Sequence, residues 1–403
     1  MKENELESMR KSFKTVYEKR KQILNSPQTK KLQENVLAIK KEAIEHYREL
    51  LEIAKDSFKA NDIDCIFAKD DIEARDVIYD IIKSEDVDTV AKSKSNTLGE
   101  IAISKYLKSK NIDVVETDLG DRILQLKGTD NKPTHPTGPA SHLNVAQIAS
   151  IVNDSMDVNV EADPKAIMKV VREDVLNRIN TSTLGISGAN AIASEDGSLV
   201  FIHNEGNISL ISLMKTHIVV VGIDKLLRTI EDAISLVKLE TIYATGSKVT
   251  SYINIVSGPS KTADIEKKLI KNMYGAEKVI VIILDNGRSE AIADIDDCLL
   301  CIGCGSCIVT CPVYNVIGNE FGFNNYLGGR GVAMSKFIED NETSYNSGLY
   351  MCTLCGLCTI NCPVAIPTNE IIEKIRSSSQ KEGFYPKKHG KFRDNIKNRN
   401  SPY

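Results

Sequence analysis

The sequence predicts an α/β fold with a mainly parallel sheet, followed by a smaller helical domain that binds metal through cysteines. Short apolar runs alternate with helical patterns from residue 61 to residue 284, which is typical of βαβ units. The runs at 218–222 and 279–283 are almost entirely apolar, so they suit strands that are covered on both faces. Nine of the ten cysteines lie between residues 298 and 362. This concentration marks the second domain.

Length and composition limit the possible classes of protein. A chain of 403 residues exceeds the ~250–300 residues at which a single core stops growing, so two or three domains are expected. The net charge of −4 gives no support to a nucleic-acid partner. The N-terminus lacks the apolar segment of a signal peptide, and no apolar run approaches the ~18 residues of a membrane helix. We therefore expect a cytoplasmic protein with no membrane span.

The expected elements follow in chain order. Residues 1–60 predict a helical segment that is broken near residues 25–28. The α/β domain is expected over residues 61–288, with strands and helices alternating in its first half: strands at 64–68, 88–93 and 113–118, and helices at 71–83 and 97–109. A second series follows a helix at 163–180, with strands expected at 198–203, 217–223, 240–245, 252–256 and 278–284. The metal-binding domain is expected over 289–380, and a polar tail over 381–403.

Two cysteine runs share the pattern C-x2-C-x2-C-x3-C-P, which bacterial ferredoxins use to bind two [4Fe–4S] clusters. Three cysteines of each run bind one cubane, and the fourth, which precedes the proline, reaches the other. We therefore expect cluster 1 at Cys301, Cys304, Cys307 and Cys362, and cluster 2 at Cys352, Cys355, Cys358 and Cys311. The long segment between the runs includes a helix-compatible stretch at 331–340. This favours the helical type of ferredoxin domain.

A pair of structural zinc sites is the alternative, but it would use C-x2-C knuckles and no shared fourth ligand. A fifth cysteine, Cys298, also lies three residues before Cys301. Only the register that begins at Cys301 places the wider gap before Cys311 and reproduces the second run. Aspartates precede Cys298, and their charge disfavours the thiolate that binds iron. Cys298 is therefore expected to be the surplus thiol.

Four stretches, at 90–101, 114–126, 185–207 and 257–266, resemble the LUD domain, which is named for lactate utilisation. With the cysteine runs that follow, the chain is similar to the iron–sulfur subunits of the L-lactate utilisation complex. The resemblance implies a fold like that of the sugar-phosphate isomerases and CoA transferases. It also implies oxidation of lactate to pyruvate together with two partners, which are a cysteine-rich, heterodisulfide-reductase-like subunit and a second LUD protein.

Candidate ligand-binding residues lie where strands are expected to end. Lys92 and Lys94 lie between a strand and a helix, a place where ligands gather in open α/β sheets, so a carboxylate or phosphate site competes with a solvated lysine pair. Glu205 ends a strand before a glycine turn, where it could act as a base, hold a hydroxyl or only form the turn.

A second group of candidates follows the strand expected at 252–256. Ser257, Gly258, Ser260 and Lys261 are expected between that strand and a helix, where free N–H groups could bind an anion or Ser260 could cap the helix. Four histidines are open to both interpretations. His203 and His217 flank strands and are expected to be structural. His135 and His142 lie in a proline- and glycine-rich loop that could cover the site.

No nucleotide, flavin or nicotinamide motif is present in the sequence. Lactate oxidation removes two electrons, whereas a cubane accepts one at a time, so we expect an electron-transfer subunit of a 2-hydroxy-acid oxidoreductase and not a complete enzyme. Two alternatives stay open. One is a small-anion-binding module that senses redox state, and the other is an electron-transfer protein of a thiol–disulfide system.

Overall fold

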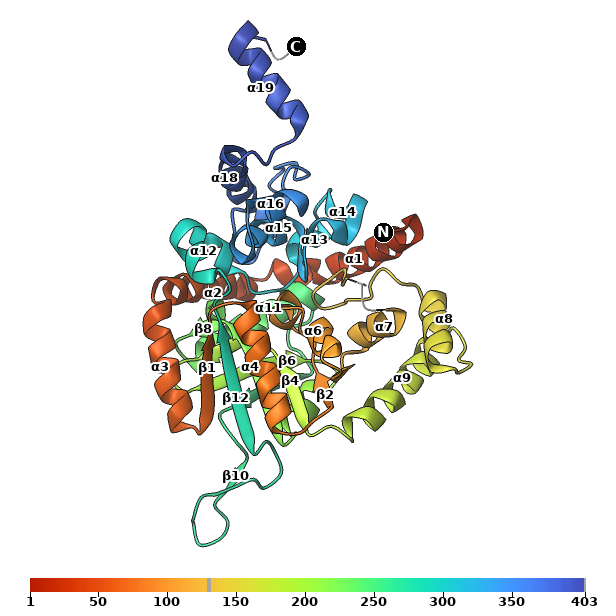
Figure 1. The fold of residues 1–403 in the computed structure, drawn as a ribbon, viewed down its shortest axis with the longest axis vertical. Helices are drawn as coiled ribbons and strands as arrows, with labels where there is room; N and C mark the ends of the chain where they lie inside the picture. The colour runs from red at the N-terminus through yellow and green to blue at the C-terminus, as the bar shows by residue number, and fades with distance from the viewer. Residues whose placement is uncertain (129–131, 402–403) are drawn as a thin grey trace.

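The computed structural model describes residues 1–128 and 132–401, and its centre is a six-stranded sheet (Figure 1). All neighbouring strands in this sheet are parallel, which confirms the predicted α/β class. In spatial order the strands are β1 (Ile63–Ala68), β12 (Lys278–Leu284), β7 (Thr216–Gly222), β4 (Leu184–Ser187), β2 (Thr89–Lys92) and β3 (Asp113–Glu116).

Both faces of this sheet are buried, as the apolar runs predict. In β7, Val219 and Val221 join one core, whereas Ile218 and Val220 join the core on the other face, because successive side chains of a strand point to opposite sides. The second core is closed by α4 (Asp71–Ser84), α5 (Asn96–Glu100) and α6 (Ile103–Ser109). Burying each of these side chains contributes roughly 1.5–3 kcal/mol.

A second, mostly antiparallel sheet contains, in order, β8 (Leu226–Leu227), β5 (Ala191–Ala193), β6 (Ser198–His203) and β9 (Tyr252–Val256). The strand expected at 240–245 is wrong, because these residues end the helix α11 (Ile230–Thr245). Thr229 caps this helix and Gly246 ends it in the left-handed conformation. The helix is buried on several sides, from Leu236 to Ala244, so its apolar pattern has little helical period.

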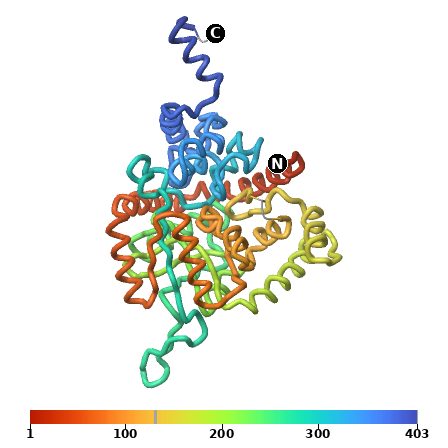
Figure 2. Tube along the Cα trace, viewed as in Figure 1, coloured from red at the N-terminus to blue at the C-terminus, as the bar shows by residue number. Residues whose placement is uncertain are grey.

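The N-terminal segment forms α1 (Glu3–Leu24), α2 (Pro27–Glu45) and α3 (Tyr47–Ala60). The break near 25–28 is confirmed: Ser26 caps α2 and Pro27 occupies its first position. A further break at His46 separates α2 from α3. Figure 2 shows the first helix, in red, lying between the sheet and the blue C-terminal helices.

The C-terminal domain is helical, as expected. Its longer helices are α15 (Gly328–Ile338), α18 (Thr368–Lys381) and α19 (Lys387–Arg399), and the last of these projects away from the body (Figure 1). The shorter ones are α12 (Arg288–Ile295), α13 (Ser306–Val309), α14 (Tyr314–Ile317), α16 (Asn341–Asn346) and α17 (Leu357–Ile360). Its apolar residues continue the first core of the sheet, so the two domains share one interior. Across residues 1–128 and 132–401, no helix is both long and apolar enough to cross a membrane.

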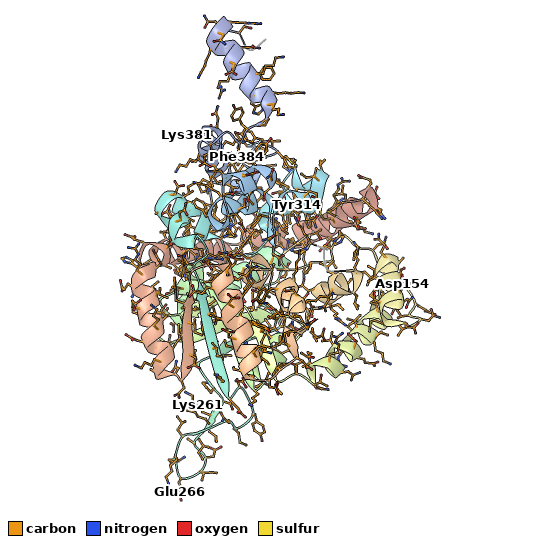
Figure 3. The ribbon with its side chains drawn as sticks, in the orientation of Figure 1. Asp154, Lys261, Glu266, Tyr314, Lys381 and Phe384 are labelled. Atoms are coloured by element: carbon orange, nitrogen blue, oxygen red, sulfur yellow. The ribbon has the colours of Figure 1, made fainter. Side chains whose placement is uncertain are left out.

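The remaining helices cover the far edge of the sheet: α7 (Leu119–Lys127), α8 (Val145–Met156), α9 (Pro164–Ile179) and, below β4, α10 (Asn207–Ser212). The helix expected after residue 256 is wrong. A hairpin projects there instead, with the short strands β10 (Lys261–Thr262) and β11 (Ile270–Lys271) (Figure 3). Glu266 and Lys267 adopt positive φ angles of 52° and 58°, which a right-handed helix cannot accommodate.

Candidate functional site

A cavity of about 260 Å3 lies at the carboxyl ends of the parallel strands. Segments that follow β2, β3 and β4 line it, and so does the end of β6. After β2, the next strand of this sheet is β3, which lies on one side of β2. After β4, the next strand of this sheet is β7, which lies on the opposite side of β4. Ligands in open α/β sheets bind at such a switch point.

Two of the predicted ligand residues reach this cavity and a third does not. Lys94 lines it and pairs with Asp118 at 2.7 Å, and Glu205 lines it while accepting the Leu119 N–H at 3.1 Å. Burial and the nearby Asp118 carboxylate raise the pKa of Glu205. Lys92 is instead buried beside the cavity in a 2.8 Å ion pair with Glu116.

The candidates after β9 lie elsewhere, which corrects the expected grouping. Lys261 and Glu266 mark the projecting hairpin at the end of the molecule opposite the C-terminal helices (Figure 3). Ser257 is held by the Ser198 hydroxyl at 2.6 Å, and Ser260 accepts the Tyr274 N–H. Without a following helix, Gly258 and its neighbours do not form a helix N-terminus, and none of these residues lines the cavity.

The four histidines are buried. His203 lines the cavity, accepts the Gly206 N–H at 3.0 Å and stacks on Tyr252. His217 bonds Ser187 within the sheet, and His142 bonds Thr134.

The loop that contains His135 covers part of the cavity through Pro136 and Thr137. Burial lowers the pKa of His135 to about 3, so this ring is neutral. It also packs beside Gly305, where a Cβ would come within 2.5 Å of Nε2. The loop therefore connects the cavity to the first cysteine run.

Sequence reasoning missed the residues that join the cavity to the first cysteine run. Ile302 and Gly303, between Cys301 and Cys304, line the cavity. On the LUD side, Lys225 donates to the Cys301 carbonyl at 3.1 Å.

Glu240 is the acidic residue at this junction, and Asn190 donates to it at 3.0 Å. Burial raises the pKa of Glu240 to about 7. The only sequence signal for this residue was a single acid in the apolar run before residue 245.

A buried polar network fixes the two domains against each other. Arg288, which begins α12, pairs with Glu100 and with Asp224, each at 2.7 Å. Tyr326 donates to the same Glu100 at 2.6 Å. Removing one partner of such a group leaves a buried charge uncompensated, at a cost of about 3–5 kcal/mol. The network therefore holds the first cysteine run at the cavity.

The cysteines of the two runs gather into two adjoining groups. Burial raises the pKa of Cys304, and the nearby thiolates of Cys362, Cys301 and Cys307 raise it further. Burial also raises the pKa of Cys311, whose thiolate neighbours are Cys358 and Cys352. The fourth cysteine of each run therefore lies beside the other run.

The donor set fits iron–sulfur clusters. The Gly303 N–H donates to the Cys301 sulfur and the Tyr314 N–H donates to the Cys311 sulfur, as in protein-bound clusters. Within the described part of the chain, no three His, Cys, Asp or Glu side chains are placed to share one metal ion. In a cubane each thiolate binds a different iron, so the ligands stand farther apart than around a single ion.

Cys298 lies in the 3-10 turn that precedes the first run. It is fully buried in the shared apolar core, and burial raises its pKa to about 11. Its backbone carbonyl accepts a hydrogen bond from Arg330.

Comparison with known families agrees with this architecture. The LUD domain model matches residues 51–284, and the 4Fe-4S dicluster domain model matches residues 297–366. The chain therefore belongs to the LUD domain family, and its C-terminal part is a 4Fe-4S dicluster domain whose cofactors are two [4Fe–4S] clusters.

Among curated proteins the chain is similar to Lactate utilization protein B. The Geobacillus thermodenitrificans relative is 35% identical over 323 residues, and the Anoxybacillus flavithermus relative is 34% identical over 323 residues. Each match covers 79% of this chain, and the chain spans 66% of each relative. A crystal structure of a DUF162 family protein from Deinococcus radiodurans covers 59% of the chain at 13% identity, with a TM-score of 0.31. That value is too low to support an argument.

Proposed function

We propose that this protein is the iron–sulfur electron-transfer subunit of a 2-hydroxy-acid oxidoreductase whose substrate is L-lactate. One observation carries the proposal: the cavity at the strand ends is lined by the loop between Cys301 and Cys304. A small ligand in the cavity would therefore lie next to cluster 1. The name of the similar proteins, Lactate utilization protein B, supports lactate as the substrate.

The proposed ligands of cluster 1 are Cys301, Cys304, Cys307 and Cys362, and those of cluster 2 are Cys352, Cys355, Cys358 and Cys311. The grouping of Cys304 with Cys362, and of Cys311 with Cys352 and Cys358, supports this crossed arrangement. When bound, the clusters supply one-electron transfer.

The proposed ligand of the cavity is a small carboxylate. Lys94 offers a cation, and the Glu205 and Glu240 carboxyls offer acceptors for a hydroxyl group. A 2-hydroxy acid carries both complementary groups on adjacent carbons. The Pro136–Thr137 segment and the dicluster domain cover the cavity and would limit its access to water.

The proposed exit for electrons is cluster 2. Cys355 is exposed, and apolar side chains surround its run, with Met351 55% and Ile360 79% exposed. Exposed apolar groups beside a cofactor ligand fit a protein-docking face. The proposed partners are a cysteine-rich, heterodisulfide-reductase-like subunit and a second LUD protein, in the cytoplasm, where thiols stay reduced.

The test uses the anaerobic complex, purified with its partners through a tag on this chain. L-lactate should reduce the clusters, seen as bleaching of their visible absorption and as an electron paramagnetic resonance (EPR) signal, while D-lactate and pyruvate serve as controls. A deletion strain should lose growth on lactate. Normal growth, together with clusters that stay oxidised, would reject the proposal and favour a redox-sensing module.

A further inference from the structure

Arg20 of α1 is a buried cation with unused hydrogen-bond donors. Its side chain lies in the interior, at 1% exposure, and Nη1 donates to the Tyr243 carbonyl at 3.1 Å. Nε and Nη2 are buried and have no hydrogen-bond partner among the described residues. An unsatisfied buried donor destabilises the folded protein, and more so when the donor is charged. A hydrogen-bond acceptor is therefore expected beside Nε and Nη2 of Arg20.

The first cysteine run lies beside Arg20. Helix α1 packs against α13, which contains Cys307. The side chains of Cys304 and Cys307 are among the neighbours of the Arg20 guanidinium. The centroid of the Tyr17 ring lies 5.5 Å from the guanidinium carbon. No carboxylate of the described residues pairs with the guanidinium, so the sulfurs of the cysteine run are the candidate acceptors.

We propose that Arg20 donates its two free N–H groups to cluster 1, which makes the N-terminal helix part of the cluster's binding site. The inference rests on the proposed ligand set for cluster 1. Four thiolates give the cluster a net negative charge, and reduction adds one more. Donors held beside its sulfurs stabilise the reduced form more than the oxidised form and so raise the reduction potential.

The proposal predicts opposite effects of one substitution in two states of the protein. Without clusters, Arg20 is a buried cation lacking partners, so Arg20→Met should raise the unfolding temperature, because an apolar side chain of similar length fills the same space. With clusters bound, the same change removes two donors from cluster 1 and should therefore lower the unfolding temperature. A purely structural role for Arg20, through the Tyr243 carbonyl, would lower the unfolding temperature in both states.

The experiment is a potentiometric EPR titration of the full-length, anaerobically reconstituted chain. Arg20→Met should shift one of the two midpoints to lower potential and leave the other unchanged, and Arg20→Lys should shift it less because the charge remains. Lys19→Met is the matched control: it removes a charge from the neighbouring exposed position, where the ammonium donates to the Ser247 hydroxyl. It should move neither midpoint.

The shifted midpoint should persist in Cys355→Ser, which keeps cluster 1 alone. Loss of cluster 1 in Arg20→Met, with retention in Arg20→Lys, would also support the contact. Unchanged midpoints in Arg20→Met, in a protein with about eight irons, would overturn this inference and leave the electron-transfer proposal intact. A wild-type protein that binds no iron would overturn both.

Discussion

The two cysteine runs have the same spacing but lie in different surroundings. The first run lies beside α1, Glu240 of α11 and the cavity, and Cys304 is only 7% exposed. The second run lies at the surface, and Cys355 is exposed. Spacing therefore determines which cofactor can bind, whereas the elements packed around each run determine what the cofactor can reach. In the proposed assignment, one cluster lies beside the cavity and the other lies near solvent.

The first prediction, with the largest change, compares the loss of one cysteine from each run in its effect on stability. Cys304→Ser and Cys355→Ser should each lose about four of about eight irons, because each removes one ligand of a different cubane. Only Cys304 lies in the core shared by the domains, so Cys304→Ser should also lower the unfolding temperature markedly. Iron analysis and thermal unfolding measure both. Equal destabilisation by the two variants would contradict the difference in surroundings.

The second prediction concerns the exposed side of cluster 2. Ile360→Asp should slow electron transfer to the co-purified partner roughly tenfold, since burying an unpaired carboxylate at a docking face costs at least ~1.4 kcal/mol. The iron content should not change. Stopped-flow reoxidation of the reduced chain measures the rate. Val249→Asp, at another exposed apolar position, is the control and should have no effect; identical rates in all three proteins would place the exit elsewhere.

The third prediction concerns Glu240, which lines the cavity, and the pH dependence of the free energy of unfolding. The pKa of Glu240 rises from 4.5 to about 7 on burial, so the folded state keeps a proton that the unfolded chain releases in this interval. The free energy of unfolding therefore falls as pH rises from about 4.5 to about 7. Glu240→Gln should remove this loss and be more stable than wild type by roughly 3 kcal/mol at pH 8, because one pKa unit corresponds to about 1.4 kcal/mol. Denaturant titrations at pH 5 and pH 8 measure the free energy of unfolding of both proteins. An equal difference between Glu240→Gln and wild type at the two pH values would contradict the raised pKa of Glu240.

The smallest effect is expected at Cys298. Because it is a buried core residue and not a proposed ligand, Cys298→Ala should keep about eight irons and lose about 1 kcal/mol of stability. Iron analysis beside the wild type measures the first quantity. A protein with about four irons would show that the first run is read in the wrong register.

The sequence predicted the parallel sheet and the cofactor class because both have local patterns. A strand buried on both faces is apolar throughout, as at 279–283, and cubane ligands keep fixed spacing. The failures were not local. Residues 240–245 lost their helical period because α11 is buried on several sides, and the expected helix after residue 256 was replaced by a hairpin with positive φ angles.

The junction residues could not be found from the sequence for another reason. Arg20 lies more than 280 positions before the cysteines it faces, and Glu240 reaches the cavity from a helix that was expected to be a strand. Neither belongs to a motif. Their proposed roles depend on tertiary packing, which brings α1 against α13 and places Glu240 beside Gly303.

The crossed ligand sets are tested most directly by the EPR spectrum of reduced Cys362→Ser. Cys362 belongs to the second run in sequence but to the first cluster in the proposed assignment. Cys304→Ser and Cys358→Ser provide the reference spectra for loss of cluster 1 and of cluster 2. The crossed ligand sets predict that the spectrum of Cys362→Ser matches that of Cys304→Ser and keeps the cluster 2 signal. A spectrum that matches Cys358→Ser would contradict the crossed ligand sets and the placement of cluster 1 at the cavity.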